Sequence, residues 1–171
     1  SVVISQFFGA KKYTEVKRTI DTLYISMLAV SVLFSLLGPM VSGKILIMMH
    51  TPQDILPQAK IFIDIYLYGI SLAFGYNTVS AVLRALGDSK TPTLYLIYST
   101  IINSILVVFF VLFLHWGIAG SALATLCAQG FSFFGLVWHV NRRENTLLHI
   151  RCRSARFDTE LFKKILVIGM P

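Results

Sequence analysis

Residues 91–141, TPTLYLIYSTIINSILVVFFVLFLHWGIAGSALATLCAQGFSFFGLVWHVN, decide the fold, because none of them carries a formal charge. About 20 predominantly apolar residues cross the hydrocarbon core of a bilayer. The 51 uncharged residues between Lys90 and Arg142 are therefore enough for two spans. The tripeptide His115-Trp116-Gly117 divides the stretch near its middle. The sequence predicts two membrane-spanning helices here, joined as an antiparallel hairpin.

Two shorter uncharged stretches lie upstream of this hairpin. There are 22 residues without a charge between Asp21 and Lys44, and 19 between Asp64 and Arg84. Each stretch is about as long as one span. We therefore expect four spans in all, at roughly residues 22–41, 61–83, 93–114 and 118–140.

The composition excludes an ordinary soluble domain. Of the 171 residues, 56% are hydrophobic and only 13% are charged, and the mean hydropathy is +0.73. Soluble domains carry about 25% charged residues. Ser1–Phe8 and Leu161–Pro171 are apolar but too short to span, so we expect them to be parts of further helices of a longer membrane protein. The predicted fold is all-α: a polytopic integral membrane helical bundle with about four complete transmembrane helices and partial helices at both ends.

The basic residues are distributed asymmetrically. The connections at 9–21, 84–92 and 141–164 hold thirteen of them, whereas those at 42–60 and 115–117 hold only Lys44 and Lys60. Cytoplasmic loops carry an excess of Lys and Arg, so the first set is predicted to face the cytoplasm. Topology thus explains the net charge of +7, and we expect no nucleic-acid partner. The thirteen are Lys11, Lys12, Lys17, Arg18, Arg84, Lys90, Arg142, Arg143, Arg151, Arg153, Arg156, Lys163 and Lys164.

Local signals indicate where the helices end. Pro39 is expected to kink or end the first span. Gly87 suits the C-terminus of the second, and Thr91 followed by Pro92 predicts an N-cap with proline at the first helical position. Asp88 lies just before that helix, where a carboxylate is favourable. In the fourth span, small residues spaced four apart predict close approach of a neighbouring helix: Gly120, Ala124 and Ala128.

Polar side chains within spans are the candidates for function, because they are costly in hydrocarbon. Asp64 is the only carboxylate within a predicted span. It is either a proton or cation ligand or a residue at the level of the headgroups. Asn77 and Asn103 lie deeper, and their amides serve either a ligand or hydrogen bonds between helices. Thr125 and Gln129 are the remaining candidates.

Signals of an enzyme are missing from the sequence. The histidines at 50, 115, 139 and 149 lie far apart, and none has a metal-binding spacing such as HExxH. Cys127 and Cys152 do not form a CxxC pair. We therefore expect no catalytic residue, no metal site and no cofactor, and a transporter or channel suits the interior polarity best.

Several motifs together resemble the multidrug and toxic compound extrusion (MATE) family. In chain order these are Ser5-Gln6-x-x-Gly9-Ala10, then LRALGDSKTP over Leu83–Pro92, then Asn103, then GIAGSALAT over Gly117–Thr125 with Gln129, and finally KKILxIGxP over Lys163–Pro171. The resemblance covers essentially the whole chain, and the motifs occur in the family's order and spacing.

The resemblance implies a place within a larger transporter. Family members have about twelve helices in two repeated lobes, with the substrate path between them. Residues 1–171 would form part of the N-terminal lobe: the end of helix two, helices three to six, and the start of helix seven. Residues 141–164 would be the cytoplasmic linker between the lobes. Members export cationic amphipathic compounds across the cell membrane, plasma or inner, by alternating access, in exchange for Na⁺ or H⁺.

The resemblance also implies a site. In one branch of the family a cation site uses two asparagines and a threonine, which Asn77, Asn103 and Thr125 match. That branch also has an aspartate one turn after the second asparagine, where this sequence has Val107. The partners implied are a small cationic substrate, the bilayer and the transporter's remaining helices, with Na⁺ or H⁺ as coupling ion.

Two alternatives stay open. One is a lipid-linked oligosaccharide flippase of the same superfamily, although the 51 uncharged residues argue against the charged cavity that such a protein tends to have. The other is a membrane component that does not transport and binds partners through residues 141–164. Basic residues there suit anionic lipid at about 1 kcal/mol each near the surface.

Overall fold

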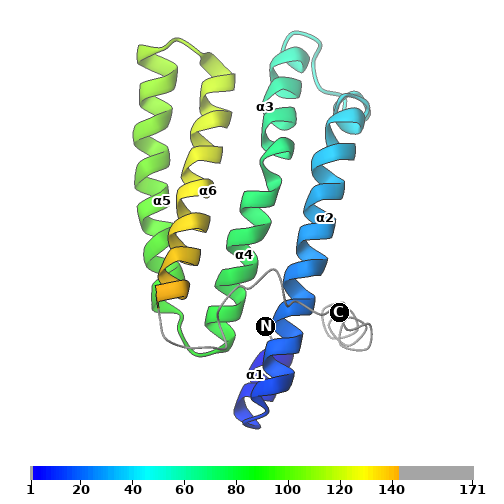
Figure 1. Ribbon diagram of the computed structural model, residues 1–171. Coiled ribbons are helices and arrows are strands. Elements are labelled where there is room, and N and C mark those ends of the chain that lie inside the picture. The colour runs from blue at the N-terminus through cyan, green and yellow to red at the C-terminus, as the bar shows by residue number, and fades with distance from the viewer. Residues whose placement is uncertain (1, 143–171) are drawn as a thin grey trace.

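The computed structural model describes residues 2–142, which form helices and contain no strand. The helices lie side by side along their length, with α5 and α6 as one pair and α2 beside α3 and α4 (Figure 1). Their bounds are Val2–Gly9 for α1, Tyr13–Met48 for α2, Leu56–Tyr68 for α3, Ile70–Ala85 for α4, Lys90–Val108 for α5, the π-helical segment Phe109–Phe113 for η1, and Gly117–Arg142 for α6. The expected linker at 141–164 and the start of a seventh helix fall almost wholly outside the described residues.

The number of spans depends on how one bent pair is counted. Three helices of the described part are long and apolar enough to cross a membrane: α2, α5 together with η1, and α6. Helices α3 and α4 pass the same test together, with a bend of 50° at the break between them. The all-α membrane bundle predicted from the sequence is therefore confirmed.

Helix α2 is longer than the predicted first span at 22–41. It is one continuous helix of 36 residues, about 54 Å long at 1.5 Å per residue. Because the hydrocarbon core is about 30 Å thick, both ends of α2 extend beyond it or the helix tilts. Pro39 was expected to kink or end the span. It does not end the helix, because α2 continues through Pro39 for nine more residues to Met48. A proline removes only one helical hydrogen bond, and the apolar turns on both sides keep the helix together.

The second predicted span is broken between α3 and α4. In a continuous helix the carbonyl of Tyr68 would accept a hydrogen bond from the amide of Leu72. Instead, that amide bonds to the carbonyl of Gly69 at 3.0 Å. The hydroxyl of Ser35 on α2 donates to the Tyr68 carbonyl at 3.2 Å. A neighbouring helix thus satisfies the carbonyl that the break releases, as a polar group in hydrocarbon requires.

Packing explains why a glycine occupies the break. A Cβ atom at Gly69 would lie 2.2 Å from a methyl carbon of Leu126 on α6. Only glycine lets α6 approach this closely. The sequence predicts one span over 61–83 but not the break within it, because this contact joins residues 57 positions apart, which no local pattern records.

A compact turn connects α4 to α5. Gly87 has a φ of +93°, and its amide bonds to the carbonyl of Arg84 at 3.1 Å. The amide of Asp88 bonds to the carbonyl of Leu83 at 2.9 Å, which completes a Schellman motif. The C-terminal role predicted for Gly87 is confirmed.

The start of α5 differs from the prediction. The helix begins at Lys90, so Thr91 lies within its first turn and is not the N-cap. The carboxylate of Asp88 accepts hydrogen bonds from the backbone amide of Thr91 at 3.0 Å and from its hydroxyl at 2.8 Å. Asp88 therefore acts as the cap, because each of its two carboxylate oxygens accepts one of these hydrogen bonds.

The hairpin of α5 and α6 closes through small residues. Ala124 and Ala128 are almost fully buried, and a Cβ atom at Gly120 would lie 3.0 Å from Phe110. The ring of Phe110 stacks on Trp116 with centroids 5.4 Å apart. The close helix approach predicted from the small-residue stripe is present.

The buried core lies toward the predicted cytoplasmic end. Outside this core, many large apolar residues on α2, α5 and α6 are exposed, as is expected of helices that face lipid. The core joins α1, α2, α4 and α6 through Ile4, Val16, Ile20, Leu23, Val79, Val82, Leu83, Leu136 and Val140.

Candidate cation site between α5 and α6

Two of the three predicted site residues meet between α5 and α6. The side-chain amide of Asn103 donates a hydrogen bond to the hydroxyl oxygen of Thr125 at 3.3 Å. The Thr125 hydroxyl in turn donates to the carbonyl of Ser121, one turn back on α6, at 3.0 Å. Both side chains are partly buried. The pair therefore sits at a helix interface and retains an open side.

The pair presents neutral oxygen atoms. Among residues 2–142, no group donates a hydrogen bond to the side-chain carbonyl of Asn103. An amide oxygen and a hydroxyl oxygen are hard ligands, which suit small cations such as Na⁺ rather than soft metals. Val107 lies one turn further along α5 and brings no carboxylate. Among the described residues, no three histidine, cysteine or acidic side chains lie close enough together to hold a metal ion.

Hydrogen bonds between the pair and the predicted cytoplasmic end hold α5 and α6 in register. The hydroxyl of Ser99, which is buried, donates to the carbonyl of Ala128 at 2.8 Å. One turn further, the hydroxyl of Ser132 donates to the carbonyl of Tyr95 at 3.2 Å. Ser132 was missed in the sequence analysis, because a serine in an apolar helix has no distinctive pattern. Both serines help to fix where Asn103 lies relative to Thr125.

Asn77 stands apart from the other two predicted residues. Its side-chain amide donates to the carbonyl of Ala73 in its own helix, at 2.9 Å, and the residue is exposed. No hydrogen bond links it to Asn103 or Thr125 in the described part of the chain. The structure therefore brings two of the three residues together and leaves Asn77 on an open face of α4.

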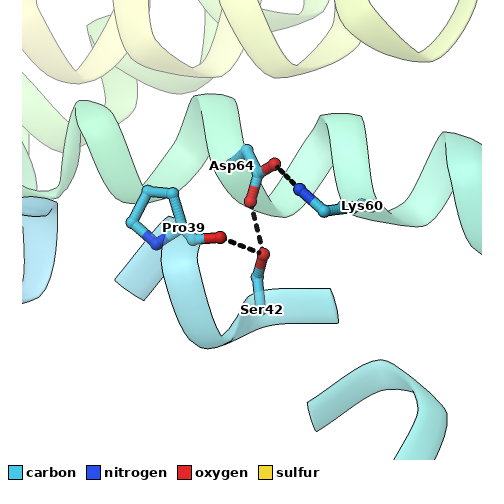
Figure 2. Close-up of polar contacts among 4 residues, drawn as sticks. All are labelled: Pro39, Ser42, Lys60 and Asp64. Atoms are coloured by element: carbon cyan, nitrogen blue, oxygen red, sulfur yellow. Dashed lines mark hydrogen bonds and ion pairs between the residues drawn. The ribbon is translucent and has the colours of Figure 1, made fainter. Parts of the chain in front are cut away.

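Asp64 belongs to a second polar cluster, between α2 and α3. Its carboxylate lies 2.5 Å from the ammonium of Lys60, one turn earlier on α3, and 2.5 Å from the hydroxyl of Ser42 on α2 (Figure 2). That hydroxyl is also 3.0 Å from the carbonyl of Pro39. Asp64 is thus an ion-paired residue that ties two helices together. The spacing of Lys60 and Asp64, four apart, is a signal of such a pair in a helix.

An apolar cavity lies beside this cluster. Its volume is about 450 Å³, and Ser42 is the polar residue among those that line it. The other lining residues are Leu33, Phe34, Leu37, Gly38, Val41, Ile45, Ile63 and Leu67. The cavity follows the α2–α3 seam and does not include Asn103 or Thr125.

Gln129, the last of the predicted polar candidates, also lies on α6. Its side-chain carbonyl oxygen is buried and has no hydrogen-bond partner among residues 2–142. It is one turn from Thr125, so α6 carries two polar side chains of different environment within one turn. No hydrogen bond among the described residues links Gln129 to Asn103 or Thr125.

Comparison with known proteins identifies relatives over the whole chain. The MatE family model matches residues 1–110. A probable multidrug resistance protein of Bacillus subtilis (strain 168), YpnP, is 32% identical over 142 residues, which are 82% of this chain and 32% of that protein. Another from the same organism, YoeA, is 30% identical over 177 residues, covering 100% of this chain and 38% of that protein. The chain thus spans about a third of the length of these relatives.

Solved structures share the same fold. The inward-facing conformation of a multidrug resistance MATE family transporter of the MOP superfamily matches with a TM-score of 0.90 at 21% identity, over 98% of this chain and 38% of that one. A MOP superfamily transporter from Pyrococcus furiosus matches with a TM-score of 0.89 at 21% identity, over 98% and 37%. The MatE model covers well over half of the 171 residues, and the described helices form a multi-pass membrane bundle. The chain belongs to the MatE family.

Proposed function

We propose that the protein to which this chain belongs is a secondary active transporter in the plasma or inner membrane of the cell. It exports cationic amphipathic drugs or toxins in exchange for Na⁺ or H⁺, by alternating access. Membership of the MatE family supports this function, as do the multidrug resistance names of two relatives. The observation that supports the proposal is the contact between Asn103 and Thr125, which brings neutral oxygen atoms together within the uncharged stretches of α5 and α6.

In this proposal the Asn103 carbonyl and the Thr125 hydroxyl contribute two ligands of the coupling cation. Both are neutral, so a bound ion keeps its full charge within the membrane. Moving one such charge through the membrane potential contributes about 2.3 kcal/mol per 100 mV. With Val107 in place of a carboxylate, the remaining ligands and any counter-charge come from other parts of the transporter. The Asn77 amide, on an exposed face, is free to contact a substrate or a neighbouring helix.

Transport by the full-length protein tests the proposal. We would express it in an efflux-deficient bacterial strain, prepare inside-out membrane vesicles and follow uptake of a lipophilic cationic dye. Uptake should require a Na⁺ or an H⁺ gradient and stop when that gradient is collapsed. Uptake that needs neither gradient would contradict an antiporter. Movement of a lipid-linked oligosaccharide instead would favour the flippase.

Single substitutions then test the site. Asn103→Ala and Thr125→Val should weaken the ion dependence of uptake, whereas Thr125→Ser should preserve it because the hydroxyl remains. Ser104→Ala is a matched control, since the Ser104 hydroxyl bonds only to the Thr100 carbonyl of its own helix, at 3.0 Å. If Asn103→Ala transports like the control at equal expression, the site is elsewhere in the protein.

A further inference from the structure

A tryptophan and an arginine, one turn apart at the C-terminal end of α6, are in contact. The guanidinium carbon of Arg142 lies 4.1 Å from the centroid of the Trp138 ring. Trp138 is 56% exposed and Arg142 is exposed as well. Stacking on the indole restrains the planar guanidinium and leaves the N–H donors at its edge directed away from the ring.

An exposed aromatic stripe leads along α6 to this arginine. Phe131 and Phe134 are 45% and 63% exposed, and they precede Trp138 by seven and four residues. Residues at positions 131, 134, 138 and 142 share one face of an α-helix. This face is thus apolar for about two turns and ends in a cation at the predicted cytoplasmic end of the bundle.

Two further cations lie at the same end of the bundle. Arg84 is in the last turn of α4, and Lys90 is the first residue of α5. Leu83 and Val140 belong to one core cluster, which brings the ends of α4 and α6 to the same level. The α4–α5 turn is only four residues long, so α5 begins at this level too (Figure 1).

These cations have no carboxylate partner in the described part of the chain. The ion pair found among residues 2–142 is that of Lys60 and Asp64, near the opposite end of the bundle. Asp88 lies between the two cations of the α4–α5 turn, but its oxygens bind the amide and hydroxyl of Thr91 as a helix cap. The basic end of the bundle therefore has a charge that an external anion can satisfy.

We propose that this surface binds an anionic phospholipid of the cytoplasmic leaflet. The phosphate lies against Arg142, with Arg84 and Lys90 adding charge, and an acyl chain runs along Trp138 and the phenylalanine stripe. Arginine suits a phosphate because its N–H groups bind two phosphate oxygens at once. Tryptophan favours the level of the headgroups. A soluble phosphate or a nucleic acid would match the cations but leave the exposed aromatic stripe without a partner.

Fluorescence quenching in vesicles of defined composition tests this proposal. The full-length protein is reconstituted into phosphatidylcholine vesicles that contain a minor fraction of brominated phosphatidylglycerol or, in parallel, of brominated phosphatidylcholine. The signal of Trp138 is the difference between the wild type and Trp138→Phe. We expect stronger quenching by the anionic lipid. Equal quenching by both lipids would overturn the proposal.

Substitutions assign the effect to the arginine. Arg142→Ala should lower the preference for phosphatidylglycerol about fivefold, which corresponds to the ~1 kcal/mol that one cation contributes near an anionic surface. Arg142→Lys should retain part of it. Lys44→Ala is the matched control, because Lys44 lies on α2 near the opposite end of the bundle, and it should leave the preference for phosphatidylglycerol unchanged. An unchanged preference in Arg142→Ala, or its loss on adding inorganic phosphate at the concentration of the lipid, would also overturn the proposal. Should Arg142→Ala fail to fold, Lys90→Ala and Arg84→Ala test the same charge.

Discussion

Lys60 and Asp64 are one turn apart on α3, and the ammonium of Lys60 lies 2.5 Å from the carboxylate of Asp64 (Figure 2). The carboxylate also lies 2.5 Å from the Ser42 hydroxyl on α2. Asp64 is the only acid within the predicted spans, and alone it would be a candidate proton or cation ligand. The structure shows instead that its charge is balanced within the same helix.

Removing one partner of this ion pair should destabilise the protein more than removing both. Lys60→Met leaves the Asp64 carboxylate without its counter-ion, at a cost of about 1–2 kcal/mol. Full burial would cost about 3–5 kcal/mol, but both side chains are partly exposed. In Lys60→Met/Asp64→Asn the unpaired charge is absent, so stability should largely return. Thermal melting in detergent, followed by size-exclusion chromatography, measures both. Additive losses in the double variant would contradict a coupled pair.

Gly69→Ala should destabilise the bundle, because the added Cβ would lie 2.2 Å from a methyl carbon of Leu126. Overpacking of this kind costs about 1–3 kcal/mol. Leu126→Ala in the same protein makes room for the new methyl group and should recover part of the loss. Gly9→Ala serves as the control, because nothing lies within 4 Å of a Cβ at that position. If both glycine substitutions lower the melting temperature equally, the contact with Leu126 is not the cause.

Asp88→Ala should weaken the start of α5 by about 1 kcal/mol, the usual cost of losing a helix cap. The neighbouring Ser89 occupies the N-cap position but makes no side-chain capping hydrogen bond, so Ser89→Ala should have little effect. Hydrogen exchange of the amides in the first turn of α5 reports the difference directly. Faster exchange in Ser89→Ala than in Asp88→Ala would show that the cap is misassigned.

Ala128→Leu should separate α5 from α6, since Ala128 is only 2% exposed and its carbonyl accepts the hydrogen bond of Ser99. We expect a loss of about 1–3 kcal/mol. The adjacent Cys127 is exposed, so Cys127→Leu adds an apolar side chain where hydrocarbon is expected and should be neutral. The melting temperatures of the two variants distinguish the faces. Equal melting temperatures would contradict the hairpin packing.

Much of the architecture follows from local composition. The hairpin helices were expected at 93–114 and 118–140, and the structure has Lys90–Phe113 and Gly117–Arg142. These bounds could be predicted because charged residues delimit the uncharged stretch and Gly117 lies at its turn, where φ is +53°. The bounds of α2 were less predictable. Residues 13–21 and 42–48, which flank the predicted span, are compatible with a helix. Nothing in the sequence therefore marks where α2 begins and ends.

The site depended on both sources of information. Asn103 and Thr125 were candidates as polar side chains within predicted spans, and a family resemblance grouped them. Their hydrogen bond depends on the register of α5 and α6, which the hydrogen bonds of Ser99 and Ser132 help to hold. The same resemblance grouped Asn77 with them, whereas its amide bonds within α4. An amide in an apolar helix has the same sequence pattern in either arrangement.

The sequence by itself determined that this chain belongs in a membrane, where its long uncharged stretches lie and which of its connections are basic. Those properties depend on hydropathy and charge, which act residue by residue and leave a direct record in composition. Only the tertiary structure decided that α3 and α4 break at Gly69, that Lys60 balances Asp64 and that Asn103 meets Thr125. Each of these depends on which side chains face one another after the helices pack. For Gly69 the decisive group is a leucine 57 residues away, whose volume leaves no room for a Cβ.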